Sequence, residues 1–397
     1  MDDLMRWSAI SILAAAAIGA GCGLIGAEDD DSDGRSCITV DDGEELEGDT
    51  TLDGDCYQID DPLVITSGET TIAPGTTLYF GSDAGLSFEQ SSTLTIGADG
   101  DETVELRGDD AELGYWRGIE LRGHGPHHIE GARIADAGSS SWSDDQVRRA
   151  GLVVADNRVD VAIVDVEFDN NEHAAIVTDA ALASMEVTDS RFVNNDVPMR
   201  LLAHHPDGLG MGLSFADNRR DVVIVRGDDP LTEDVEWPDL AVSYRVDDIV
   251  TVEGRLAVAS GTTVEFDRHA GIDVAGGVLD AEASTHDPIR FVGTNDSAGY
   301  WRGLRFRSTP STDISRIAHA VVSHGGSERW DHGWSNSQAN VLVDDGGRLA
   351  IDHTLIADGD YHGISVRDGY VTGCEGLEYD GLRRHDYHPT SEDDECQ

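Results

Sequence analysis

The sequence contains no lysine, and its 27 basic residues, all arginine, are outnumbered by 78 aspartates and glutamates. The formal net charge of the 397-residue chain is therefore −51 at pH 7. This charge excludes binding to nucleic acids, because cationic side chains hold a phosphate backbone. A calcium-dependent lyase needs a basic residue to abstract the proton, and without lysine arginine would have to serve.

A surface this acidic repels itself, so the compact state is favoured where salt screens the charges. We therefore interpret the composition as adaptation to high salt. The alternative is an ordinary acidic secreted protein from a GC-rich genome. Carboxylates are also the hard oxygen ligands that Ca²⁺ prefers. The chain has no spaced acidic loop or glycine-rich nonapeptide to hold that ion. We expect no metal and no cofactor, and Ca²⁺ remains an unassigned alternative.

Cysteine is scarce, and the absence of any Cys-x-x-Cys pair among the five residues argues against zinc. The first cysteine, Cys22, follows the apolar run 7–18 and the small residues 19–21. Such a run is typical of a signal peptide, and small residues before a cysteine resemble a lipoprotein processing site. The sequence predicts a lipoprotein-type signal peptide at 1–22 with lipidation at Cys22, and an acidic disordered tether at 23–34. Ordinary cleavage or an uncleaved anchor is the alternative.

Windows with a helical period are few, and an internal duplication is prominent instead. The segment GYWRGIELR at 114–122 returns 185 positions later as GYWRGLRFR at 299–307. The segment at 75–80 returns at 261–266. Ordered matches at a nearly constant offset indicate a body made of two copies.

A shorter repeat lies inside the copies. Alternating apolar runs end in Asn, Asp or Gly, with Phe168, Phe192 and Phe215 spaced by 24 and 23 residues. Alternation with period two is typical of a half-buried strand, and Asn and Asp tolerate the positive φ of tight turns. A unit this short buries its apolar face only by stacking on neighbours, and a propeller blade needs about 40–50 residues. We predict an all-β parallel β-helix with the three phenylalanines in register.

These features resemble the exported bacterial proteins with right-handed parallel β-helix repeats. The resemblance spans roughly residues 60–370 and is carried by TIAPGTTLYF at 71–80, WRGI at 116–119, the Phe-x-x-Asn turns, and Trp237 with the entry Tyr244-Arg245-Val246. It implies a right-handed, single-stranded, pectin-lyase-like solenoid with internal duplication. It implies little about activity, because such helices serve lyases, hydrolases, adhesins and passive surface proteins.

The expected organisation is a cap at 35–61, copies at 62–241 and 242–373, and a second cap or tail at 374–397. Caps are needed because a solenoid exposes an unpaired strand edge at each end. Export permits disulfides, and four cysteines allow three pairings. The ends of a rod do not meet, so we expect Cys37–Cys56 and Cys374–Cys396, each contributing about 3 kcal/mol by chain entropy.

The repeated WRG motif has a structural interpretation. We expect Trp116 and Trp301 to cover a corner of the core, and Gly118 and Gly303 to mark a close approach of two backbones.

Each copy also carries about ten extra residues in one coil, since 134 to 168 and 322 to 356 both span 34 residues. The extra residues include WSDDQ at 142–146 and WSNSQ at 334–338. Loops on a rigid scaffold often bind ligands, and tryptophan beside Asp, Asn and Gln suits a sugar ring. The candidate ligand-binding residues are Trp142, Asp144, Gln146, Trp330, Trp334, Asn336 and Gln338. In the alternative interpretation the tryptophans only fold back onto the coil.

A weaker catalytic alternative is Asp344, Asp345 and His362. These residues resemble the paired-Asp and His-Gly motifs of polygalacturonases, whose hydrolysis uses close carboxylates. The Asn-Thr-Asp and Arg-Ile-Lys segments of that family are absent here. The other histidines, including His127 and His205, are expected to be exposed.

The sequence therefore predicts an exported rod at the cell envelope or surface, held on a membrane by its lipid, or otherwise secreted. We expect it to be non-catalytic and to bind glycans or surface proteins, with two copies of one loop giving bivalent binding. The alternative is a polysaccharide-cleaving lyase or glycoside hydrolase.

Overall fold

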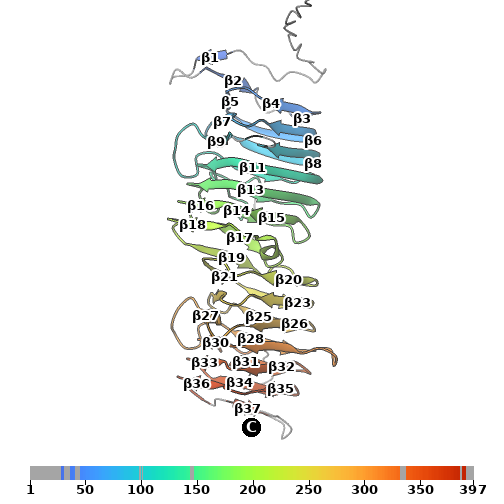
Figure 1. Ribbon diagram of the computed structural model, residues 1–397, viewed down its shortest axis with the longest axis vertical. Helices are drawn as coiled ribbons and strands as arrows, with labels where there is room; N and C mark the ends of the chain where they lie inside the picture. The colour runs from blue at the N-terminus through green and yellow to red at the C-terminus, as the bar shows by residue number, and fades with distance from the viewer. Residues whose placement is uncertain are drawn as a thin grey trace, which may run out of the picture.

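The computed structural model describes residues 28–30, 36–40, 45–97, 100, 102–143, 147–330, 337–384 and 387–389. Within them the chain forms a parallel β-helix, seen in Figure 1 as a long rod of stacked coils that runs from β2 to β37. The predicted fold class is confirmed: nearly all strand pairs are parallel, and every coil rests on the one before.

Each coil has three faces, which we call A, B and C. In the N-terminal cap and copy one, face A contains β2 (Ser36–Val40), β5 (Cys56–Ile59), β7 (Thr77–Phe80), β9 (Val104–Gly108), the ends of β11 (Gly125–Ala135) and β13 (Val159–Asp169), β16 (Arg191–Val193) and β18 (Ser214–Ala216). Face B contains β3 (Glu45–Glu47), the beginnings of β6 (Pro62–Ile72) and β8 (Gly85–Ile96), β10 (Gly118–Leu121), β12 (Leu152–Val154), β14 (Ile176–Thr178), β17 (Met199–Leu202) and β19 (Val222–Arg226). Face C contains β4 (Thr50–Leu52), the ends of β6 and β8, the beginnings of β11 and β13, and β15 (Ser184–Thr188), followed by the 3-10 helix η1 (His205–Gly208).

Copy two repeats this order with shorter strands. Its face A contains β21 (Ser243–Val246), β24 (Thr263–Phe266), β27 (Ile289–Gly293), β30 (Ala320–Ser323), β33 (Leu355–Ala357) and β36 (Glu378–Asp380). Its face B contains β22 (Ile249–Val252), β25 (Gly271–Ala275), β28 (Gly303–Arg307), β31 (Ala339–Asp344), β34 (His362–Arg367) and β37 (Tyr387–Pro389). Its face C begins with β20 (Asp234–Trp237), which lies before the expected boundary at 241 but pairs with the next strand of copy two. The other strands of this face are β23 (Arg255–Val258), β26 (Val278–Glu282), β29 (Ser315–Ala318), β32 (Arg348–Asp352) and β35 (Tyr370–Gly373).

The aromatic side chains stack inside the coils as predicted. Phe168 pairs with Phe192 and Phe192 with Phe215, with ring centroids 5.3 and 5.4 Å apart. Trp116 stacks on Phe80 at 3.9 Å, and Trp301 stacks on Phe266 at 4.0 Å. Each of the two tryptophans is fully buried, which confirms that the repeated motif serves the core.

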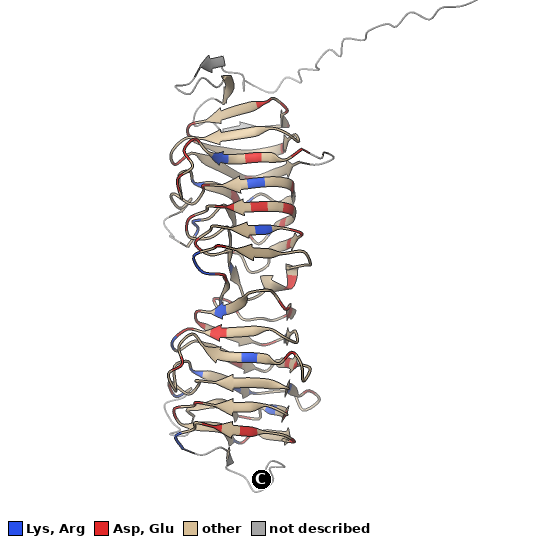
Figure 2. Cartoon of the chain, turned by 60° about the vertical axis from the view of Figure 1, so that its left-hand side comes forward, with Lys and Arg blue, Asp and Glu red and all other residues tan. Residues whose placement is uncertain are grey.

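A switch in strand pairing joins the two copies. β19 lies on face B of copy one, yet its free edge pairs with β21, the first strand of face A in copy two. β18, the last strand on face A of copy one, pairs with β16 and with no other described strand. The stack on face A is therefore interrupted, and Figure 2 shows the break between the upper and lower halves of the rod.

The N-terminal end of the rod is closed by Cys37–Cys56, the predicted disulfide. In the segment expected to be a tether, Glu28–Asp30 forms β1, which pairs antiparallel with β2 and covers its edge. Cys374 is disulfide-bonded, and its expected partner Cys396 lies outside the described residues, as does Cys22.

Disulfides persist in oxidising compartments, so the Cys37–Cys56 bond indicates an exported protein. Within the described residues no helix has the length and apolar character that a membrane span requires.

Candidate functional site

The extra loop of copy one folds over face B. Trp142 is half-buried, and the guanidinium of Arg117 lies 4.9 Å from its ring centroid. The ring packs against Gly85, where an added Cβ would lie 2.7 Å from the Cζ2 atom of Trp142. The indole Nε1 is buried and has no hydrogen-bond partner among the described residues.

In copy two the same place is taken by Trp330. Arg302 lies 5.3 Å from its ring, and the ring packs against Gly271, the counterpart of Gly85. The repeated motif aligns Trp142 with Trp334. In the structure, however, the residue that occupies the position equivalent to Trp142 is Trp330, four residues before Trp334. Trp334, Asn336, Asp144 and Gln146 lie outside the described residues, and Gln338 donates a hydrogen bond to the carbonyl of Ser327 at 3.4 Å.

The surface beneath the loop of copy one is largely apolar. A small cluster of buried residues forms it on the outer side of face B, with Val147 packed against it. Its buried members are Ala150, Val153, Ala155, Ala174, Val177, Val197 and Ile224. Glu120 lies near one end, buried against Ser87 and 3.6 Å from Arg148, and burial raises the pKa of its carboxyl group.

Next to this cluster is a pocket of about 290 Å³ that is rich in arginine. It is lined by Val147, Arg149, His173, Ala174, Val177, Asp196, Arg200 and Arg220. Arg149 is paired with Glu172 at 3.0 Å, and Arg220 is paired with Asp196 at 3.0 Å. Arg200 lies between Val177 and Ile224 in the strand register and makes no hydrogen bond or ion pair with any described residue.

The electrostatic environment of Arg200 is unfavourable to its charge. Burial lowers the pKa of its guanidinium, and Asp247 and Asp196 oppose this effect, while the neighbouring Arg226 and Arg220 lower the pKa further. Burial and Arg149 also lower the pKa of His173. A guanidinium stays ionised in proteins, so the pocket holds an incompletely compensated positive charge.

Face B of copy two carries different chemistry. Arg305 binds Asp344 through two hydrogen bonds of 3.0 and 2.8 Å, and Arg307 binds Asp273 in the same way. The carboxylate of Asp344 is fully buried, and burial raises its pKa. The aspartates on this face are therefore held by arginine.

The residues of the catalytic alternative do not converge. Asp344 and Asp345 both lie near Arg367, at 3.7 and 3.6 Å, at the end of β31. His362 is buried and pairs with Ala339 at the beginning of β31. Five residues of strand separate positions 339 and 344, which corresponds to about 16 Å.

The expectation that the histidines outside the catalytic alternative are exposed is wrong for His127 and His205, which are both buried. His127 accepts a hydrogen bond from the Leu94 N–H at 3.1 Å, and His205 lies 3.1 Å from the Ala183 carbonyl. The rings of His127 and His205 lie within hydrogen-bond distance of backbone groups inside the coils, a role that their sequence positions do not reveal.

Acidic residues on face A are also neutralised. Arg133 is bound to Glu105 at 3.1 Å, to Glu167 at 3.2 Å and to Asp169. Arg191 extends the series at 3.5 Å from Glu167. Figure 2 shows the resulting alternation of red and blue down this face. In the part of the chain that the structure describes, no group of three His, Cys, Asp or Glu side chains is placed to hold a metal ion.

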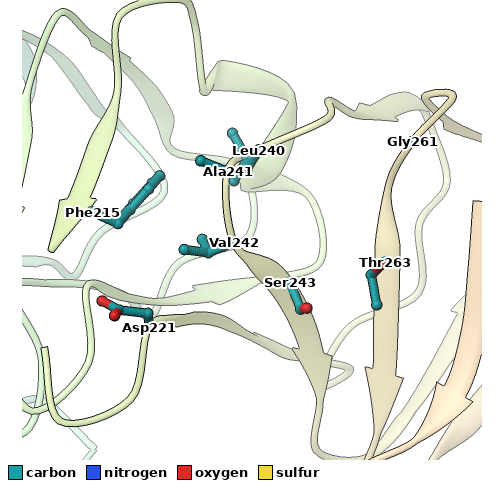
Figure 3. A pocket seen from close by; sticks show the side chains of 8 residues that line it. All are labelled: Phe215, Asp221, Leu240, Ala241, Val242, Ser243, Gly261 and Thr263. Carbon is teal, nitrogen blue, oxygen red and sulfur yellow. The ribbon is translucent and has the colours of Figure 1, made fainter. Parts of the chain in front are cut away.

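The break in face A forms a groove of about 390 Å³ (Figure 3). Phe215 projects from one side, and Leu240, Ala241 and Val242 lie on the segment opposite. Asp221, Ser243, Gly261 and Thr263 complete the lining. No sequence pattern predicts this groove, because it arises from the pairing switch between the copies.

Comparison of the chain with protein-family models, with curated proteins and with solved structures finds no match.

Proposed function

We propose that this protein is an exported, non-catalytic rod at the cell envelope that binds an anionic glycan on face B of its first copy. The observation that carries the proposal is Arg200, which has no ion-pair partner among the described residues although the chain has a net charge of −51. Arginine binds carboxylate and sulfate oxygens through its planar fork of N–H groups.

The rest of the pocket suits a sugar. Val147, which is half-buried, offers apolar surface to a ring, while Arg200 faces its acidic group. A volume of about 290 Å³ is at the small end of ligand pockets, which fits one sugar residue of a larger glycan. High salt screens the long-range repulsion between the acidic rod and an anionic polymer, whereas contacts within a partly buried pocket are screened much less.

The ion pairs on the outer faces support a non-catalytic role. Hydrolysis of a glycosidic bond needs two accessible carboxyl groups about 5–10 Å apart. Asp344 and Asp273 are bound to Arg305 and Arg307, and Glu120 is buried under the loop. Lipidation of Cys22 is part of the proposal, and a Cys22→Ser protein that remained in the membrane fraction would contradict that part.

A glycan-array screen in high salt, followed by calorimetry on the acidic glycans that bind, tests the proposal. We expect Arg200→Ala to weaken binding at least about tenfold, since it removes a charge-assisted contact. Arg191→Ala is the matched control, because Arg191 is an exposed arginine on face A. Trp142→Ala and Trp330→Ala show whether the loops contribute.

Two results would contradict the proposal. One is the absence of glycan binding, or binding that Arg200→Ala and Arg191→Ala affect equally. The other is the release of shorter products from a bound polysaccharide, which would identify the protein as an enzyme.

A further inference from the structure

The groove between the copies contains an unpaired strand edge in the middle of the rod. β18 is paired with β16 on one side, and no described strand pairs with its other side. Within a sheet, such an edge is a template for the addition of another strand. Many peptide-binding proteins use an edge of this kind, with main-chain hydrogen bonds supplying affinity and side-chain pockets supplying specificity.

The backbone of Phe215 is directed toward the open edge. In a parallel ladder, alternate residues bond to opposite neighbours. Ser214 donates its N–H to the Ser190 carbonyl at 3.0 Å, and the Ala216 carbonyl accepts from the Asn194 N–H at 3.3 Å, so both serve the β16 side. The N–H and C=O of Phe215 therefore point toward the groove, where no described residue bonds to them.

The lining of the groove includes hydrophobic side chains. Phe215, Leu240 and Val242 line it and, like the neighbouring Leu213, are half-buried and packed against the main core. The stack of phenylalanines ends at Phe215, whose ring lies on Phe192 at 5.4 Å. An apolar side chain on an added strand would pack beside Phe215 and bury it further.

Charge decides which partner fits. Asp221 lines the groove, Asp217 and Asp239 are exposed beside it, and none of the described residues that line it is basic. A second copy of the chain would bring another 51 negative charges to this edge and be repelled. A basic segment would be attracted.

We propose that this groove binds one extended segment of another protein, in which apolar and basic residues alternate, as an added strand beside β18. The segment exchanges main-chain hydrogen bonds with Phe215, directs its apolar side chains onto Leu240 and Val242, and directs its basic side chains toward the aspartates. The groove and the glycan pocket share no lining residue, although Arg220 of the pocket is followed directly by Asp221 of the groove.

The test uses a fluorescent nonapeptide of alternating arginine and valine with a central phenylalanine, measured by fluorescence anisotropy in about 0.5 M NaCl to suppress non-specific attraction. One comparison peptide carries glutamate in place of arginine. Another carries N-methyl groups on alternate amides, which removes the donors on one edge. We expect each to bind the full-length protein at least about tenfold more weakly than the parent peptide.

Variants locate the site. Phe215→Ala and Val242→Asp are expected to weaken the parent peptide at least about tenfold, whereas Leu182→Asp, an exposed control outside the groove, leaves it unchanged. Hydrogen exchange at the Phe215 amide should slow when the peptide binds. Circular dichroism checks that each variant is folded. If Val242→Asp is unfolded, peptide binding by Phe215→Ala and the hydrogen-exchange measurement show whether the peptide binds in the groove.

Several outcomes would overturn the inference. These are no binding of the parent peptide, equal binding of the N-methylated or glutamate peptide, or equal loss in Leu182→Asp. Self-association of the wild type that Val242→Asp abolishes would show that the occupant is a second copy. Arg200→Ala should not change peptide binding, so failure of the glycan proposal leaves this test intact.

Discussion

Glycine occupies the points where one coil approaches the next most closely. Gly118 and Gly303 have φ values of +102° and +113°, which L-residues rarely adopt. An added Cβ would lie 2.1 Å from the Ala150 carbonyl oxygen in the first case and 2.3 Å from that of Ala339 in the second. The WRG motif is thus repeated because its glycine permits the contact that supports the adjacent buried tryptophan.

This contact can be tested at Gly303. Gly346 also has a positive φ, but an added Cβ there meets nothing within 4 Å. We expect Gly346→Ala to lower the free energy of unfolding by about 1–2 kcal/mol through backbone strain alone. Gly303→Ala adds a steric clash and should cost at least about twice as much. Similar urea midpoints for the two variants would contradict the role assigned to the close approach.

At the scale of the element, a ladder of buried asparagines holds the corner between faces A and B in copy one. The Nδ2 group of Asn171 donates to Oδ1 of Asn195 at 2.9 Å, and that of Asn195 donates to Asn218 at 3.0 Å. The same Nδ2 groups bind backbone carbonyls of Ile134 and Phe168 at 3.1 and 2.9 Å. Buried polar groups need such partners, so the ladder fixes the path of each turn.

Replacement of the middle member should be costly. Asn195→Ala removes the acceptor for the Asn171 N–H and the donor to the Phe168 carbonyl and leaves both groups buried. We expect a loss of about 2–4 kcal/mol in the free energy of unfolding. Asn157→Ala removes only an exposed hydrogen bond from the Leu182 N–H, so it is the control and should change the free energy of unfolding by no more than about 1 kcal/mol. If urea unfolding shows the same loss of stability for both variants, the asparagine ladder does not contribute specifically to the stability of the fold.

The two copies are alike in their strands and differ in what covers them. Each places a tryptophan beneath an arginine on face B, Trp142 with Arg117 and Trp330 with Arg302. On the rest of face B, copy one has the outer cluster of buried apolar residues and the arginine-rich pocket. Copy two has the ion pairs Arg305–Asp344 and Arg307–Asp273 there. The described surfaces below the two loops therefore differ, and bivalent binding through two equal loops stays a prediction.

At the scale of the whole molecule, the charge of −51 acts on every part of the rod. We expect the midpoint of thermal unfolding to rise steadily as NaCl increases from about 0.15 M to about 3 M, because salt screens the repulsion among carboxylates. A midpoint that stays constant or falls would refute the interpretation as salt adaptation. Arg133→Gln is a useful comparison, since it breaks the charge series on face A and should make the midpoint depend more strongly on salt.

The sequence by itself determined the coil, the duplication, the stacked phenylalanines and the Cys37–Cys56 disulfide. All of these follow from spacing along the chain, because the length of a coil decides which residue lies above which. Trp116 was predictable for the same reason: its motif recurs at the same point of both copies.

Only the tertiary structure decided what happens on the outside of the coils and between the copies. The unpaired Arg200, the role of Trp330 in place of Trp334, and the groove beside Phe215 all depend on how a loop folds over a face, or on β19 pairing with β21. Outward-facing residues are not constrained by the repeat, because the periodic burial that defines a solenoid acts only on the side chains that point inward.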